Sequence, residues 1–153
     1  MYYKMILHKL IGAPLRYMTQ TLDLFCFGFG ENVTYTNLLG YKRDVAKYAL
    51  HVQCPFSIKE NDKYILPSDW RKYMSNKLHI NSYYEYIHTI VEKVLYSRVI
   101  KWIELSYNNN LKIGFEDSIL EIYPNGKEES WRFFEPGQNT SHLVASNEWI
   151  ELQ

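Results

Sequence analysis

The stretch SYYEYIHTIVEKVLYS, residues 82–97, decides the fold class of this chain. Apolar side chains recur in it at helical spacing and form one stripe, while most positions between them are polar or charged. Ser82 and Glu85 form a capping box, in which the Ser82 hydroxyl accepts a backbone N–H and Glu85 reaches back. The segment therefore predicts a capped amphipathic helix over about 82–97 that packs against a sheet. The apolar stripe consists of Ile87, Ile90, Val91, Val94 and Leu95.

After this helix the apolar pattern changes to a period of two, which is typical of half-buried strands. Asn, Gly and Pro separate the strands, and separators this short favour antiparallel neighbours. The sequence thus predicts an antiparallel meander with the helix packed on one face, which makes the fold α+β. The predicted strands are 98–107, 111–116, 119–123, 131–135 and 142–152.

The first half of the chain gives weaker signals. Residues 3–11 are compatible with either a short helix or a strand. Residues 22–30 and 43–54 are expected to be strands, the first of them ending in a turn at its glycines. The polar stretch 59–68 is expected to be a loop or a hairpin tip. Because the 153 residues contain no repeat or linker, we expect a single domain, 1–153.

The composition argues against several classes of protein. With only two cysteines, Cys26 and Cys54, no disulfide framework is expected. Every apolar run is interrupted well before the roughly 18 residues that a membrane span requires, so we expect no membrane segment. The first residues lack the basic head and long apolar core of a signal peptide, and we therefore expect a cytoplasmic location.

The charges are balanced overall but unevenly distributed. The net charge is zero, which argues against binding to nucleic acid. Residues 1–80 carry 11 Lys and Arg against 6 Asp and Glu, whereas residues 81–153 carry 6 against 11. Between Glu116 and Glu151 there are eight acids and two bases. The second half is thus the acidic half of the chain.

No motif for catalysis or metal binding is present in the sequence. The five histidines lack the i, i+4 spacing of a helical zinc site. His51 and Cys54 are three residues apart, so on a strand they would face opposite sides and could not share a metal. Cys54 is expected to be buried as a small apolar side chain. With no nucleophile elbow or phosphate-binding loop either, we expect no enzymatic activity, no metal and no cofactor.

The acidic half offers a candidate binding surface. Glutamates there surround aromatic residues, and such a surface would attract and anchor a basic protein partner. An ordinary solvated sheet face with a few core aromatics is the alternative interpretation. The candidate binding residues are Glu121, Glu128, Glu129, Trp131 and Glu135.

Several segments together resemble an uncharacterised family of small bacterial proteins. They are LHKLIGAPL at 7–15, HVQCPFSI at 51–58, LEIYP at 120–124, and WRFF at 131–134 with His142-Leu143-Val144 further on. Some families of this kind are immunity proteins, which neutralise a toxin encoded beside them by tight binding. The resemblance implies a non-enzymatic protein-binding function, with a toxin domain as the partner.

Two further hypotheses stay open. The chain could be a small-ligand-binding or enzymatic domain whose site is assembled only in the fold. Its polar groups would then be His51, Gln53, Arg132 and His142. A pocket that holds convergent polar groups with shifted pKa values would favour this hypothesis. A structural or accessory subunit is the other alternative.

Overall fold

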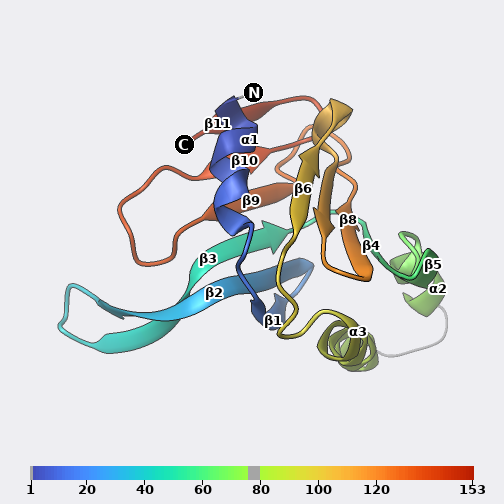
Figure 1. Ribbon diagram of the computed structural model, residues 1–153, viewed down its shortest axis with the longest axis horizontal. Coiled ribbons are helices and arrows are strands. Elements are labelled where there is room, and N and C mark those ends of the chain that lie inside the picture. Colours follow the sequence, from blue (N-terminus) through green and yellow to red (C-terminus); the bar gives the residue numbers. More distant parts are fainter. Residues whose placement is uncertain (1, 76–79) are drawn as a thin grey trace.

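The computed structural model describes the backbone of residues 2–75 and 80–153, and the side chains of residues 2–72 and 83–153. In this part of the chain the strands form two antiparallel sheets, and helices accompany them (Figure 1). The fold is therefore a mixed α and β structure. One sheet has six strands in the order β1-β2-β3-β9-β10-β11 and the other five in the order β5-β4-β8-β7-β6.

The bounds of the strands are as follows. The six-stranded sheet contains β1 (Leu15–Thr21), β2 (Leu24–Thr36), β3 (Lys42–Val52), β9 (Trp131–Phe134), β10 (Leu143–Ala145) and β11 (Ile150–Leu152). The five-stranded sheet contains β4 (Phe56–Glu60), β5 (Lys63–Leu66), β6 (Trp102–Leu105), β7 (Leu111–Gly114) and β8 (Ser118–Ile122).

Helices lie at the start and in the middle of the chain. The ambiguous segment 3–11 is helical, as α1 (Tyr2–Leu7) followed by a 3-10 turn, η1 (His8–Leu10). The stretch 59–68 contains the tip of the β4–β5 hairpin, as predicted. Asn61 and Asp62 form the turn at this tip, and both adopt the positive φ that such a turn requires. The central helices are α2 (Trp70–Ser75) and α3 (Ile80–Val94).

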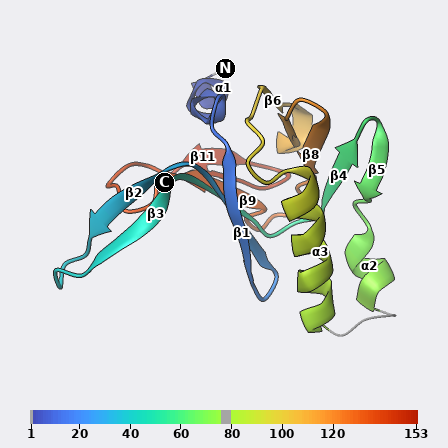
Figure 2. The ribbon, with the colours of Figure 1, turned by 60° about the horizontal axis from the view of Figure 1, so that its bottom comes forward.

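Helix α3 is the amphipathic helix that the sequence predicts, and all five residues of its apolar stripe are buried. It contacts β1 and β5, which are edge strands of the two sheets (Figure 2). The helix therefore closes an open side between two sheets, whereas the sequence predicted that it covers one face of a single sheet. The backbone is already helical at Ile80, so Ser82 lies inside the helix. The side chain of Ser82, and with it the predicted cap, lies outside the described residues.

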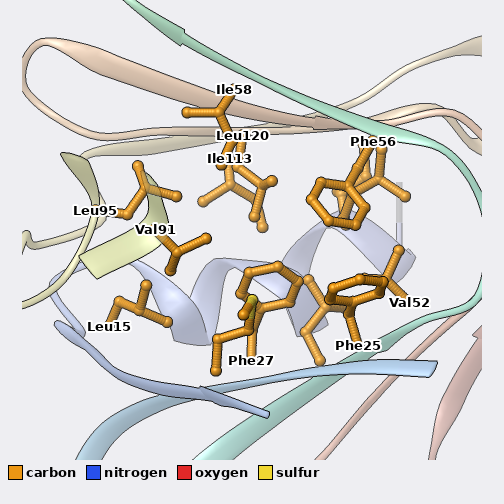
Figure 3. Close-up of a cluster of buried hydrophobic side chains, with 14 of the residues drawn as sticks. Leu15, Phe25, Phe27, Val52, Phe56, Ile58, Val91, Leu95, Ile113 and Leu120 are labelled. Atoms are coloured by element: carbon orange, nitrogen blue, oxygen red, sulfur yellow. The ribbon is translucent and has the colours of Figure 1, made fainter. Parts of the chain in front are cut away.

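The core fills the space between the two sheets and α3 (Figure 3). Phe25 and Phe27 of β2 pack edge-on against Phe56 of β4, with ring centroids 5.0 and 5.8 Å apart. Such edge-to-face pairs add about 0.5–1.5 kcal/mol to the burial of the rings. Val91 and Leu95 complete this cluster from the helix side. One continuous apolar cluster thus joins both sheets.

The prediction of a single meander in the second half is wrong. Strands β6, β7 and β8 do follow one another, but β8 pairs next with β4 of the first half. Strand β9 pairs with β3 in the other sheet. The connection from Tyr123 to Ser130 is long enough to allow this crossing between the sheets. The predicted strand 142–152 is in fact the hairpin β10–β11. The Ser146 hydroxyl turns this hairpin by accepting the N–H groups of Glu148 and Trp149.

Strand β2 continues past the glycines at which the sequence predicted its end. Gly30 adopts a φ of +89°, and the register of β2 with β3 shifts between Phe29 and Asn32. Beyond this bulge neither β1 nor β9 pairs with the two strands. Residues 32–46 therefore form a two-stranded projection, here called the arm, which extends beyond the body in two views (Figures 1 and 2).

Truncation of the helix stripe should destabilise the protein far more than truncation of the exposed side of α3. Ile87→Ala removes a fully buried side chain and should lower the free energy of unfolding by about 2–4 kcal/mol. Lys93→Ala, the matched control on the exposed side, should change it by no more than about 0.5 kcal/mol. Urea unfolding of both variants measures the difference. Equal midpoints for the two variants would contradict the packing of α3.

Candidate functional site

The side chains of β9 alternate between the core and the outer face of the six-stranded sheet. Trp131 and Phe133 are buried in the core cluster. Arg132 and Phe134 lie on the opposite face, because successive side chains of a strand point to opposite sides. Arg132 pairs in register with His51 of β3 on one side and with Val144 of β10 on the other. Strand pairing thus brings Arg132 next to His51 on the outer face.

Arg132 is the centre of a polar cluster on this face. Its Nε donates to Oε2 of Glu129 at 3.0 Å and its Nη2 donates to Oε1 at 2.7 Å, a two-point ion pair. Its Nη1 lies 2.8 Å from Nδ1 of His142. Since a guanidinium has no acceptor, Nδ1 accepts and the neutral ring carries its proton on Nε2. Gln53 donates to the same carboxylate at 3.5 Å. The cluster therefore holds the His142 ring in one tautomer.

Phe134 joins the two histidines of the cluster. The His142 ring stacks on Phe134 with centroids 4.5 Å apart, and the His51 ring meets it edge-on at 4.8 Å. Burial lowers the pKa values of both histidines, and the positive charge of Arg132 lowers them further. The four polar residues that the sequence expected to meet only in the fold do therefore meet. Glu129 lies among them as a fifth member.

A pocket of about 510 Å³ opens beside this cluster, and we call it the outer pocket. The sheet supplies its floor, including Thr19, Ala49 and His51. The arm supplies one wall, and the loop after β9 supplies another. Tyr35 of the arm lies against Gly137 of that loop, where a Cβ atom would come within 2.7 Å of the tyrosine ring. A glycine at position 137 is thus required for this contact between arm and loop.

The five residues that the sequence assigned to an acidic binding surface do not form one surface. Trp131 is fully buried and donates from Nε1 to the Asn109 carbonyl, so it is not an exposed anchor. Glu121 belongs to the five-stranded sheet, where it accepts a hydrogen bond from Asn110. These two placements follow from strand alternation, which a list of nearby acids and aromatics cannot reveal.

The remaining three glutamates differ from one another in their surroundings. Glu129 is bound to Arg132, as described above. Glu135 lies 3.8 Å from Lys9, so its charge is partly balanced. Glu128 is exposed. A continuous acidic patch built from the predicted residues is therefore absent from the described structure.

Sequence reasoning did not find the two tyrosines of the site, and it included Phe134 only within the segment 131–134. Phe134, Tyr17 and Tyr35 all line the outer pocket. The only indication in the sequence that aromatic rings approach the backbone here is the presence of two glycines, Gly28 and Gly137. A Cβ atom at Gly28 would overlap the Tyr17 ring, just as one at Gly137 would crowd Tyr35. A glycine inside a strand often marks such a close approach, but the sequence does not say which ring approaches it.

The two thiol groups lie on different sides of the six-stranded sheet, with Cys26 at the outer pocket and Cys54 in the core. Cys54 is in the core, as predicted, and burial raises its pKa to about 12. His51 lies on the outer face, so the two residues do not share a site. Among the described side chains, no three His, Cys, Asp or Glu residues gather in a way that could hold a metal ion.

Two further observations bear on function. No helix in the described part of the chain is long and apolar enough to cross a membrane. Comparisons with models of protein families, with curated proteins and with solved structures found no match. The geometry of the outer face and the chemistry of its residues therefore carry the functional proposal below.

The histidine cluster should make the stability of the protein pH-dependent. Both folded-state pKa values lie below the ordinary value of 6.5, so the unfolded chain binds more protons as the pH falls through that value. The free energy of unfolding should therefore decrease from pH 7.5 towards pH 5. Urea unfolding at several pH values should give a smaller decrease for the double variant His51→Gln, His142→Gln. His8→Gln, whose ring is exposed outside the cluster, serves as the control. An unchanged pH dependence in the double variant would contradict this account.

The two thiols should differ in reactivity. Burial raises the pKa of both thiols, but Cys54 is 1% exposed, whereas Cys26 is half-buried and lines the outer pocket, where a reagent can reach it. In native protein a disulfide reagent should therefore modify Cys26 first, and Cys54 only after denaturation. Cys26→Ser should remove the fast phase. A fast phase that persists in that variant would place Cys54 at the surface.

Proposed function

We propose that this protein is a non-enzymatic protein-binding domain that meets its partner through the arm. The observation that carries the proposal is the exposure of apolar side chains at the arm's tip. Leu38, Leu39 and Tyr41 are 106%, 81% and 70% exposed. Single exposed apolar residues are common, but three within four positions of a projecting loop are typical of an interaction site.

The tip is braced from within, which favours binding. The Asn37 side chain accepts the N–H groups of Leu39 and Tyr41, both at 3.0 Å. The Asn37 N–H donates to the Tyr41 carbonyl at 2.9 Å, and Gly40 takes the positive φ of the turn. A loop that is held in one conformation loses less entropy on binding. The leucines are thus presented to the partner by an ordered loop.

Side chains along the arm hold it in place. Thr34 donates to Asp44 across the two strands at 2.8 Å. Tyr35 lies against Gly137 of the body. An isolated two-stranded hairpin is marginally stable in water, so these contacts support its projection from the sheet. The arm is therefore suited to act as a rigid docking element.

The partner that fits this proposal is a toxin domain, with the protein acting as its cytoplasmic immunity protein. The resemblance of several segments to small bacterial proteins supports this choice. The acidic excess of residues 81–153 supports a basic partner, although the charge is spread over several elements. Tight binding of this kind needs apolar anchors as well as charge, and the arm supplies them.

Binding of a small ligand is the second candidate function. The outer pocket favours it, because its volume of about 510 Å³ lies in the range typical of ligand sites. His51 contributes a polar group to the pocket wall. The exposed leucines of the arm have no role in this second function, and for that reason we rank it below protein binding.

Removal of the leucines should abolish binding without unfolding the protein. In Leu38→Ser, Leu39→Ser the partner loses two apolar contacts, and the affinity should fall by at least about tenfold. The partner to test is the purified product of a toxin gene adjacent to this protein's gene, measured by biolayer interferometry. Rescue of growth in cells that express this toxin should be lost in parallel.

Leu22→Ser is the matched control, since Leu22 is 89% exposed in the turn between β1 and β2, outside the arm. This variant should keep both affinity and rescue. Circular dichroism should be unchanged in both variants. The proposal fails if the arm variant binds and rescues as well as the control does.

A further inference from the structure

We propose that the outer pocket receives one aromatic side chain, Trp or Tyr, of the protein partner that docks on the arm. The inference rests on the proposed function, because the arm forms one wall of the pocket. A partner that covers the arm would therefore extend over the pocket opening. Buried Trp and Tyr residues are common anchors in protein interfaces, and they fill pockets of this kind.

The floor of the pocket carries a small residue beside an aromatic ring. Gly28 of β2 and Ala49 of β3 pair in register in the middle of the sheet. The Tyr17 ring lies directly over Gly28, so the glycine seats this ring against the sheet and leaves no further space above itself. Ala49 lines the floor of the pocket and is 4% exposed, so its side chain takes up little of the pocket volume. A guest ring would therefore lie beside Tyr17.

The walls favour an aromatic group over an aliphatic one. Tyr17, Tyr35 and Phe134 line the pocket, and His51 adds a fourth ring. Aromatic pairs in stacked or edge-on arrangements gain stabilisation beyond the burial of area, which Leu or Ile would not obtain. Phe134 already makes both kinds of contact, with His142 and with His51. A guest ring would extend this aromatic cluster.

The charges of the pocket favour neither a cationic nor an anionic guest. Arg43 and Asp44 are adjacent and of opposite sign, and no other acid, Lys or Arg lines the pocket within the described residues. The pocket lining therefore carries no net charge that would attract a Lys or a Glu side chain in preference to an uncharged one. His51 resists protonation, so its ring offers one acceptor nitrogen to an indole N–H or a phenol O–H. Trp and Tyr satisfy both conditions, since each has an apolar ring and one donor.

The pocket can be tested without the partner by using blocked amino acids as probes. N-acetyl-tryptophanamide carries the side chain together with the backbone that a protein partner would present. We expect it to shift the backbone amide signals of Thr19, Ala49, His51 and Phe134 saturably in ¹H–¹⁵N spectra. N-acetyl-tyrosinamide should act similarly, and N-acetyl-leucinamide should bind at least about tenfold more weakly.

Filling the pocket should abolish the effect. Thr19→Phe adds a ring from an exposed floor position, so the fold should tolerate it, and the saturable shifts should disappear. Lys93→Phe is the matched control, which adds the same ring on the exposed side of α3 and should leave them intact. Tyr35→Ala opens the wall and should weaken binding of the tryptophan probe by at least about fivefold. Amide spectra of the unliganded variants verify that each is folded.

Several outcomes would overturn the inference. Equal affinity for the leucine and tryptophan probes would remove the aromatic selectivity. Free indole that binds while N-acetyl-tryptophanamide does not would make the pocket a small-molecule site. Tighter binding of adenosine than of the tryptophan probe would make it a nucleobase site.

The inference and the proposed function fail separately. If no probe binds but the arm leucines are required for the toxin partner, the pocket has no aromatic guest and the docking proposal stands. If the tryptophan probe binds but the arm variant keeps full affinity for the partner, the docking proposal fails while the pocket remains an aromatic receptor.

Discussion

Pairing of β9 with β3 and β10 determines which side chains face the core and which form the site. In this register the inner residues Trp131 and Phe133 complete the core, and the outer residues Arg132 and Phe134 meet His51 and His142. A slip by one residue would exchange the two sets, burying Arg132 and exposing Trp131. The cost of burying an unpaired guanidinium opposes that slip. The core and the site therefore depend on the same four residues.

Contacts of Trp131 extend this constraint to the second sheet. Its Nε1 donates to the carbonyl of Asn109, in the turn that links β6 to β7. The Asn109 side chain donates to the carbonyls of Ser146 and Trp149, in the turn that links β10 to β11. In the β6–β7 turn Asn109 itself adopts a positive φ, a conformation that Asn tolerates well. One asparagine thus joins a hairpin of each sheet to the central tryptophan.

The elements that depend on local pattern were predictable from the sequence. The apolar stripe of α3 and the buried state of Cys54 follow from periodicity and composition, and the structure confirms both. The strand predicted at 43–54 is also present, as β3 over Lys42–Val52, and ends two residues earlier than predicted. The meander prediction failed because short separators specify neighbours along the chain, whereas the residues paired between β8 and β4 and between β9 and β3 are 58 to 85 positions apart. The arm was missed because Gly30 indicated a turn but forms a bulge.

The candidate site was predictable only in part, for the same physical reason. His51, Gln53, Arg132 and His142 stood out as polar residues, and long-range pairing was needed to bring them together. Trp131 was taken for a surface anchor because aromatic rings serve cores and interfaces equally well, and only the strand's facing distinguishes the two. Glu129 was assigned to an acidic surface, although its carboxylate neutralises Arg132 at the edge of the outer face.

The facing of β9 can be measured directly by nuclear Overhauser effects between its side chains and their neighbours. The account predicts contacts from the Phe134 ring to the imidazole protons of both His51 and His142. It also predicts that the Trp131 indole shows contacts to core side chains and none to either imidazole. Contacts of the Phe134 ring with core residues such as Phe27, together with contacts between Trp131 and the histidines, would contradict the account. That result would show β9 turned to its opposite face, and both the core and the outer pocket would then have to be rebuilt.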